Sequence, residues 1–455
     1  MKKPIILFAS LLFMMIHVTS WAQWQSVGSG IASSPRQIFS ISAVNENVIW
    51  AVANHPTSLK SFDFTVSVDG GLTWNAGLLP DSIGNYYPGE IFALNDQVAW
   101  VLMISIPDQD KVRIFRTSDH GSSWHEQRGQ FNTARFAFAS LHFFNASDGI
   151  AFGSPGTGIT FIDSLRIFRT SDGGDHWTRI PAQTLPAPLA GEGVWIYGDN
   201  RYESLGDSLW FVTRASRVFR TTDKGLTWQA FNAGISGNSN YPGLASIAFK
   251  NSMEGIVTTY FPSRAAVTID GGETWMPLAM PSTPGAADIQ FIPGTSGTYV
   301  INEGWLSSGN TSKFLLTHNS GNTWETTSYT PVIPVLRFLS PTIGFAGGAI
   351  FSKGSGGIYK WTGNFATSTT TIAQTNSMID IYPNPLKDKM QFSFESNTMT
   401  SGSVAQILDY NGRKMIEKSI TGNSGVMDLS GLPSGSYLLR IHSKDQIHLG
   451  TIAKQ

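Results

Sequence analysis

Four acidic residues stand where long polar connections meet short apolar runs, namely Glu90, Glu192, Asp199 and Glu203. Carboxylates in such positions could cleave a glycosidic bond, because glycoside hydrolases place two of them on opposite sides of that bond, about 5 to 9.5 Å apart. The sequence does not say which pair meets at that distance. We therefore treat all four as candidate catalytic residues of a hydrolase.

Tyrosines gather in the same connections. Tyr87-Pro88-Gly89 and Tyr241-Pro242-Gly243 repeat one tripeptide at the entry to two apolar runs, and Tyr86 precedes the first. Flat aromatic rings stack on sugar faces and on peptide side chains. Tyr86, Tyr87 and Tyr241 are therefore our candidate ligand contacts. The other interpretation is that these rings only pack their own loops.

Several other kinds of chemistry lack the residues they need. The chain of 455 residues has no cysteine, which excludes disulfides, thiolate catalysis and cysteine-bound zinc. Its nine histidines are scattered without metal-binding spacing, so we expect no metal and no cofactor. The net charge is -1 and no basic run occurs, which argues against a nucleic-acid partner.

The strands that position these residues are indicated by an octapeptide that occurs six times in the chain. Its third and eighth positions are Asp69 and Trp74, Asp119 and Trp124, Asp172 and Trp177, Asp223 and Trp228, Asp270 and Trp275, and Asn319 and Trp324. Successive tryptophans are 50, 53, 51, 47 and 49 residues apart. Three short apolar runs precede each copy. This period is that of one four-stranded blade of a β-propeller.

The octapeptide makes physical sense as a structural turn. The carboxylate at its third position accepts hydrogen bonds from backbone N–H groups further along the turn. Glycine at its fifth position adopts a positive φ without strain, and the tryptophan buries a large ring between sheets. We expect the six copies to be structural, each stabilising its own turn. Calcium binding or catalysis at the copies is the alternative, although the spacing of a calcium loop is missing.

A seventh unit keeps the strands but lacks the octapeptide. Its apolar runs are 335–340, 343–347 and 357–361, and it has no outer strand of its own. The segment Trp24-Gln25-Ser26-Val27 looks like the outer strand of the other units. We expect it to complete the seventh blade, because closing the ring removes exposed sheet edges. The predicted fold is therefore all-β, with a seven-bladed β-propeller over 24–364.

The two ends of the chain have other roles. Residues 1–22 resemble a secretory signal peptide, with Lys2 and Lys3 before an apolar run and a cut before Gln23. A retained membrane anchor is the alternative, and no later stretch is long and apolar enough to cross a membrane. Residues 365–377 are rich in Thr and Ser and are predicted to be a linker. Residues 378–455 alternate as in a small Ig-like β-sandwich.

The repeats resemble the Asp-box (BNR) family of propellers. That family includes sialidase-superfamily enzymes and photosystem II assembly and stability factors, and its boxes lie away from the ligand face. Arg179-Ile180-Pro181 imitates a sialidase signature but follows the third octapeptide, whereas the family places it before the first. We interpret it as a coincidence. The single ring is most similar to the assembly-factor branch, which has no catalytic apparatus.

The C-terminal residues resemble the type A sorting domain of the type IX (Por) secretion system of Bacteroidota. The resemblance is carried by Tyr382-Pro383-Asn384-Pro385, by Gly412-Arg413 after an Asp-containing run, and by Leu432-Pro433-Ser434-Gly435 before a strand. It implies export by the type IX machinery to the cell surface or the medium, and in the family the domain is often removed afterwards. An adhesive Ig-like module is the alternative.

These observations favour a secreted or cell-surface binding platform for a polysaccharide or protein ligand, which is not an enzyme. A glycoside hydrolase acting on extracellular polysaccharide is the second hypothesis. A structural component of the cell surface without a soluble ligand is the third.

Overall fold

The computed structural model describes most of the chain. The described residues are 23–32, 35–80, 85–107, 111–129, 131, 136–156, 165–194, 201–281, 288–302, 312–329, 332–350, 357–365, 379–393, 403–409, 414–442 and 447–455. The expected signal peptide and nearly all of the expected linker lie outside these residues, so their boundaries stay predictions.

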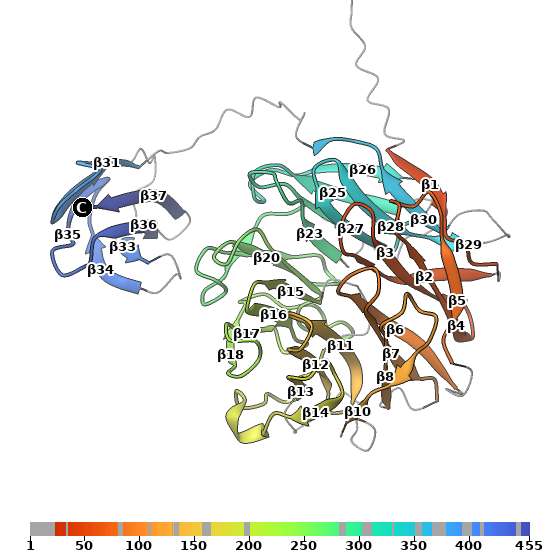
Figure 1. The fold of residues 1–455 in the computed structure, drawn as a ribbon. Helices are drawn as coiled ribbons and strands as arrows, with labels where there is room; N and C mark the ends of the chain where they lie inside the picture. The colour runs from red at the N-terminus through yellow and green to blue at the C-terminus, as the bar shows by residue number, and fades with distance from the viewer. Residues whose placement is uncertain are drawn as a thin grey trace, which may run out of the picture.

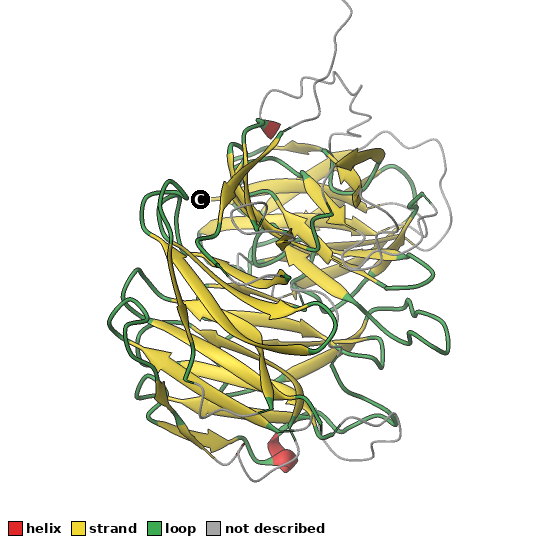
Figure 2. Cartoon of the chain, turned by 90° about the vertical axis from the view of Figure 1, so that its right-hand side faces the viewer, coloured by secondary structure: helices red, strands yellow, loops and turns green. Residues whose placement is uncertain are grey.

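Strands dominate the described residues (Figure 2), and seven sheets form a ring, as predicted (Figure 1). In the part of the chain that the structure describes, helix is limited to single turns such as η3 (Ala182–Thr184). The four main strands of each sheet pair antiparallel with their neighbours, and alternate side chains along each strand face the two neighbouring sheets.

The first three blades are built from the following strands: β2 (Arg36–Ala43), β3 (Ile49–His55), β4 (Leu59–Ser67) and β5 (Asn75–Leu78) in blade 1; β6 (Tyr86–Ala93), β7 (Ala99–Ser105), β8 (Val112–Thr117) and β9 (His125–Glu126) in blade 2; β11 (Ala137–Phe143), β12 (Gly149–Ser154), β13 (Arg166–Thr170) and β14 (His176–Arg179) in blade 3.

The next three blades follow the same order from the innermost strand outward: β15 (Tyr202–Leu205), β16 (Ser208–Val212), β17 (Arg217–Thr221) and β18 (Gln229–Asn232) in blade 4; β19 (Ser246–Phe249), β20 (Gly255–Thr258), β21 (Ala265–Thr268) and β22 (Met276–Leu278) in blade 5; β23 (Asp288–Phe291), β24 (Tyr299–Asn302), β25 (Ser312–Thr317) and β26 (Glu325–Tyr329) in blade 6.

Blade 7 joins the two ends of the ring. It consists of β27 (Val335–Ser340), β28 (Ile343–Gly347) and β30 (Ile358–Trp361), and its outer strand is β1 (Trp24–Gly28). Trp24 pairs with Trp361 in an antiparallel register. The Trp24 ring also packs against Phe338 and Trp361 at centroid distances of 5.6 and 5.2 Å. The predicted closure by the N-terminal segment is confirmed.

Two short strands cross between blades, and the sequence did not predict them. β10 (Arg128–Gly129) leaves blade 2 and pairs in parallel with β14, on the outer edge of blade 3. β29 (Ala349–Ile350) leaves blade 7 and pairs with the start of β2, on the inner edge of blade 1. Both add a strand to a neighbour, so blades 1 and 3 have five strands.

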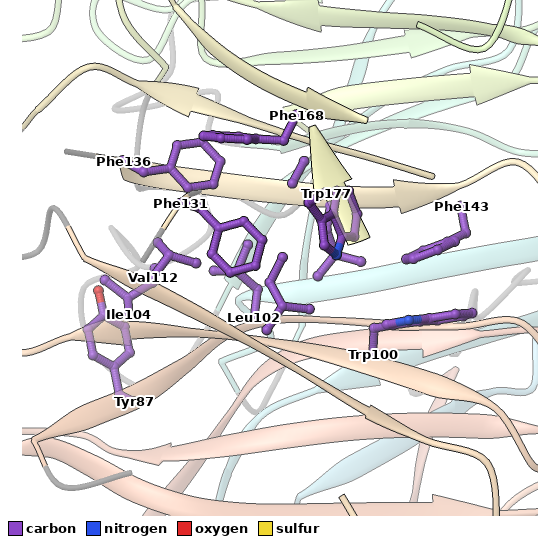
Figure 3. Packing of buried hydrophobic residues seen from close by; sticks show 13 residues of the cluster. Tyr87, Trp100, Leu102, Ile104, Val112, Phe131, Phe136, Phe143, Phe168 and Trp177 are labelled. Carbon is purple, nitrogen blue, oxygen red and sulfur yellow. The ribbon is translucent and has the colours of Figure 1, made fainter. Parts of the chain in front are cut away.

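The core lies between adjacent blades. Between blades 2 and 3 the rings of Trp100 and Phe143 stack at a centroid distance of 3.7 Å, and the edge of Trp177 contacts Phe143 at 5.7 Å (Figure 3). All three side chains are buried. Stacked and edge-on aromatic pairs stabilise a fold by about 0.5–1.5 kcal/mol beyond the area they bury. The rigid wall that results fixes the positions of the loops at both ends of each blade.

Side chains also connect the innermost strands around the ring. The Ser42 hydroxyl accepts a hydrogen bond from the Ala93 N–H, and the Ser246 hydroxyl accepts one from the Ile289 N–H. The Gln290 amide donates to the Leu336 carbonyl and accepts from the Phe338 N–H. An innermost strand has one edge without a strand partner, so these bonds satisfy backbone groups that the sheets leave open.

The C-terminal unit is a sandwich of two small sheets, drawn in blue in Figure 1. One sheet has the order β31, β32, β35 and the other β34, β33, β36, β37. Both contribute to one core, with Phe392 and Met427 from the first and Ile407, Leu439 and Ile452 from the second. The strands are β31 (Asp380–Tyr382), β32 (Lys389–Ser393), β33 (Ser403–Leu408), β34 (Lys414–Ile420), β35 (Ser424–Asp428), β36 (Gly435–His442) and β37 (Ile447–Lys454).

Candidate ligand-binding face

The ring has two ends with different residues. The octapeptides form the turns between the third and fourth strands, and we call the end that carries them the octapeptide face. The connections from each outer strand to the next blade, and from second to third strands, lie at the opposite end because neighbouring strands are antiparallel. We call this end the loop face.

Each octapeptide is held by hydrogen bonds within its own turn. In the first copy, Asp69 Oδ1 accepts from the Ser67 hydroxyl at 2.9 Å and from the Thr73 N–H at 2.8 Å. Asp69 Oδ2 accepts from the Thr73 hydroxyl at 2.5 Å. The Gly71 N–H donates to the Ser67 hydroxyl oxygen, and Gly71 has a φ of 90°. Both carboxylate oxygens are therefore occupied by the turn itself.

Two copies show which parts of this arrangement are interchangeable. In the third copy His176 takes the place of the threonine, and its Nδ1 lies 2.8 Å from Asp172 Oδ2. In the sixth copy the Asn319 Oδ1 accepts from the Thr323 N–H, and its amide nitrogen donates to the Thr323 hydroxyl. A neutral amide therefore stabilises this turn as a carboxylate does, so the geometry of the turn does not depend on a negative charge.

The acids of the octapeptide turns are ionised at neutral pH. Hydrogen bonds from Thr73 lower the pKa of Asp69 to about 2, and hydrogen bonds from Ser123 lower that of Asp119 to about 2. Burial raises the pKa of Asp172, but hydrogen bonds from His176 and Thr170 outweigh it and bring the value to about 2. Among the described residues, no three His, Asp or Glu side chains gather as a metal site would require.

On the loop face, Glu192 belongs to a buried ion pair. Its side chain is 1% exposed, and Arg217 donates to both carboxylate oxygens, with the Nε bond at 2.8 Å. The Thr213 hydroxyl and the Leu189 N–H donate to the same carboxylate at 3.2 and 3.1 Å. Four donors hold this group in place, which leaves it no lone pair directed at a substrate.

Glu90 is also beside an arginine. Its Oε2 lies 3.8 Å from Arg201, and both side chains are less than 10% exposed. Asp199, the third candidate acid, lies outside the described residues.

Glu203 has a different environment near the start of the innermost strand β15. Burial raises its pKa to about 7, although the positive charge of Arg337 and the Ser204 N–H act in the opposite direction. Arg337 comes from β27 in blade 7, so a charge from elsewhere in the ring reaches this carboxyl group. A carboxyl group with such a pKa is able to exchange protons at neutral pH.

The three candidate tyrosines differ in exposure. Tyr87 is 5% exposed and belongs to the core between blades 2 and 3. Tyr86 is half-buried, and the Arg113 guanidinium lies over its ring at 5.8 Å. Tyr241 is half-buried, and its ring lies 4.9 Å from that of Tyr260. Tyr86 and Tyr241 therefore present part of a ring to solvent, whereas Tyr87 does not.

Two exposed apolar residues on the loop face were missed from the sequence. Phe261, in the connection between β20 and β21, is 42% exposed, and Leu189, before blade 4, is 44% exposed. The Asn238 N–H donates to the Phe261 carbonyl, which ties this connection to the loop that contains Tyr241. Tyr260-Phe261-Pro262 repeats the order of Tyr86-Tyr87-Pro88, which is the signal that could have identified it. We call Tyr241 and Phe261, whose loops are joined in this way, the apolar patch.

Comparisons with known proteins divide the chain into two parts. Residues 380–454 match the family model described as a secretion system C-terminal sorting domain. No curated protein matches the chain.

The propeller is similar to solved structures at low sequence identity. Ycf48 from Cyanidioschyzon merolae is 15% identical, and the match covers 75% of this chain and 99% of that protein with a TM-score of 0.51. A structure of Ycf48 bound to a D1 peptide is 15% identical over 76% of this chain and 98% of that one, with a TM-score of 0.49. An ancestral GH74 enzyme is 11% identical over 94% of this chain and 63% of that one, with a TM-score of 0.48.

The first of these similarities shows the fold of a propeller and nothing more specific. In the described residues, no helix is long and apolar enough to cross a membrane. The C-terminal unit is a type IX secretion sorting domain, and the protein is therefore secreted or displayed on the outer surface of the cell.

Proposed function

We propose that the propeller is an extracellular binding platform of the Asp-box type, whose loop face binds a polysaccharide or a protein. The observation that carries this proposal is the contrast on that face. The carboxylate of Glu192 is fully engaged by Arg217 and its neighbours, whereas the side chains of the apolar patch remain accessible. Accessible aromatic rings at the rim of a rigid scaffold suit ligands with flat apolar faces.

The experiment measures binding of the full chain to plant, algal and microbial polysaccharides, and scores new reducing ends in the same samples. We expect one polymer to bind without being cleaved, and Phe261→Ala and Tyr241→Ala each to weaken binding about tenfold, the loss typical of a well-packed contact residue. Leu226→Ala is the matched control, because Leu226 is 57% exposed on the octapeptide face.

Other outcomes have defined meanings. Release of reducing ends that is lost in Glu90→Gln or Glu203→Gln would establish the glycoside hydrolase and overturn the platform. Binding that survives both loop-face substitutions would move the ligand away from the apolar patch. If no polysaccharide binds, the same variants are compared in affinity capture of surface proteins, where the loss of one captured partner in Phe261→Ala is expected.

A further inference from the structure

The fifth octapeptide is more buried than its counterparts. Asp270 is 4% exposed, whereas the acids at the same position in the other described copies are partly or fully exposed. The residue before it, Ile269, is half-buried, whereas Val68 at the same place in the first copy is 50% exposed. The fifth copy makes the same hydrogen bonds within its turn as the first copy. The difference therefore comes from something that covers the fifth turn from outside.

The covering group is in the C-terminal sandwich. Arg440 Nη1 lies 3.0 Å from Asp270 Oδ2, and the two side chains are 6% and 3% exposed. The contact is between charges and lacks the geometry of a hydrogen bond. Figure 1 shows the blue unit on the side of the ring where blade 5 lies, near β20.

Arg440 points away from the core of its own unit. Its neighbours on β36, Leu439 and Ile441, face the sandwich core, so Arg440 projects from the outer face of the sheet. Its Nε donates to the Gln406 side-chain oxygen at 2.8 Å, which holds the guanidinium in place. Arginine is almost never fully buried unless it is paired. Its burial here requires a partner surface, and the fifth octapeptide turn of the propeller supplies one.

We propose that in the intact chain the sorting domain packs against blade 5, with Arg440 and Asp270 as the anchoring ion pair. The outer face of the β34, β33, β36, β37 sheet then covers the fifth octapeptide turn. The loop face at the other end of the ring stays open, so a ligand and the sorting domain do not compete. The same docking hides one sheet face of the sorting domain from the export machinery until the two units separate.

The electrostatics of Asp270 agree with this arrangement. Burial raises its pKa, but hydrogen bonds from Thr274 and Thr268 and the charge of Arg440 outweigh burial and hold the pKa below its usual value. The carboxylate is therefore negative at neutral pH and faces a positive guanidinium. Removing one member of a buried pair leaves the other charge uncompensated, which destabilises the contact more than the pair itself stabilises it.

The test uses the natural absence of cysteine. Spin labels at Leu226→Cys and Val426→Cys, exposed positions on the propeller and the sorting domain, report the distance between the two units in the full chain. We expect one narrow distance distribution in the parent protein. Arg440→Glu and Asp270→Asn should each broaden it and lose the narrow peak. Asp270→Asn should keep the hydrogen bonds within its own turn, because Asn319 at the same position of the sixth copy bonds to the Thr323 N–H and hydroxyl.

Two matched controls separate docking from general effects. Asp223→Asn changes the same position in blade 4, and Lys389→Glu reverses a charge on the other sheet of the sorting domain, in an exposed pair with Asp428. Both should keep the narrow peak. A broad distribution in the parent protein, or a narrow peak that persists in Arg440→Glu and Asp270→Asn, would overturn the proposal. Circular dichroism of each variant establishes that both units are folded.

Discussion

At the scale of single residues, the acids of the octapeptides link stability to pH. Hydrogen bonds in the folded turns lower the pKa of Asp69 and Asp119 from 3.8 to about 2. A carboxyl group with a lower pKa in the folded state stabilises the fold above its unfolded value and loses that effect as the pH falls through its folded value. We expect the contribution of these carboxyl groups to the free energy of unfolding to be constant between pH 5 and 7 and to fall between about pH 4 and 2.

Urea unfolding at a series of pH values measures this dependence. Replacing Asp69, Asp119 and Asp172 together by asparagine should make the free energy of unfolding decrease less steeply below pH 4, because the amides do not titrate. The turns should still form, since Asn319 makes the corresponding hydrogen bonds in the sixth copy. If the free energy of unfolding of the triple variant decreased as steeply below pH 4 as that of the parent protein, other groups would control acid unfolding.

The glycines of the turns predict a second residue-scale effect. Gly225 has a φ of 81°, and a Cβ at this position would lie 2.7 Å from Ile150 Cγ2. Gly206 has a φ of 63°, and no atom lies within 4 Å of its Cβ position. Backbone strain alone should make Gly206→Ala cost about 1 kcal/mol. Gly225→Ala adds a steric clash and should cost about 2–4 kcal/mol. Thermal unfolding measures the stability of both variants, and an equal loss of stability in the two would contradict this prediction.

At the scale of elements, strand β1 closes the ring from the other end of the chain. Trp24 packs on Phe338 and Trp361, so Trp24→Ala should remove these contacts and lower stability by about 2–3 kcal/mol, less than for a fully buried tryptophan. Gln25→Ala is the control, because Gln25 lies exposed on the same strand. Hydrogen exchange at β30 should rise in the first variant and not in the second, and equal exchange would be the contrary result.

In the C-terminal unit, one side chain connects the first strand segment to the last. Asn384 donates to the Thr451 carbonyl and accepts from the Ala453 N–H, both at 2.8 Å. Asn384→Ala should therefore cost about 1–3 kcal/mol in this unit, as expected for two hydrogen bonds. Tyr382→Ala should cost less, since Tyr382 is 52% exposed. Hydrogen exchange along β37 in the full chain compares the two variants. A larger increase in exchange in Tyr382→Ala than in Asn384→Ala would contradict the role of Asn384 in holding β37.

The sequence predicts most elements because their determinants are local. The hydrogen bonds of each octapeptide join residues two or four positions apart, so the recurrence alone predicts the turns and the blades. The missing outer strand of the seventh unit likewise predicts closure by residues 24–27. The strands β10 and β29 and the pair of Glu192 with Arg217 depend on how long connections fold back. Those conformations leave no periodic pattern, so the state of the candidate acids could not be predicted.

At the scale of the whole molecule, the two units have separate cores. The sandwich core contains residues only from the C-terminal unit, and the clusters of the ring contain none of them. Deleting residues 380–454 should therefore leave the ring folded but abolish export. Fractionation of the producing cells measures this, with the thermal unfolding of the retained ring as the control. Efficient secretion of the truncated chain would show that export does not need the sorting domain.

The closure of blade 7 also has a kinetic consequence. The Thr362 N–H donates to the Gln23 carbonyl across 339 positions of sequence, whereas the other blades are built from neighbouring hairpins. The entropy of closing so long a loop exceeds that of a short hairpin by about 4 kcal/mol. Six blades are therefore able to form as the chain emerges, and the seventh must wait for both ends. A circular permutant that joins residue 365 to residue 23 and opens a loop-face connection should reach the closed ring sooner, because its last step becomes a short-range one.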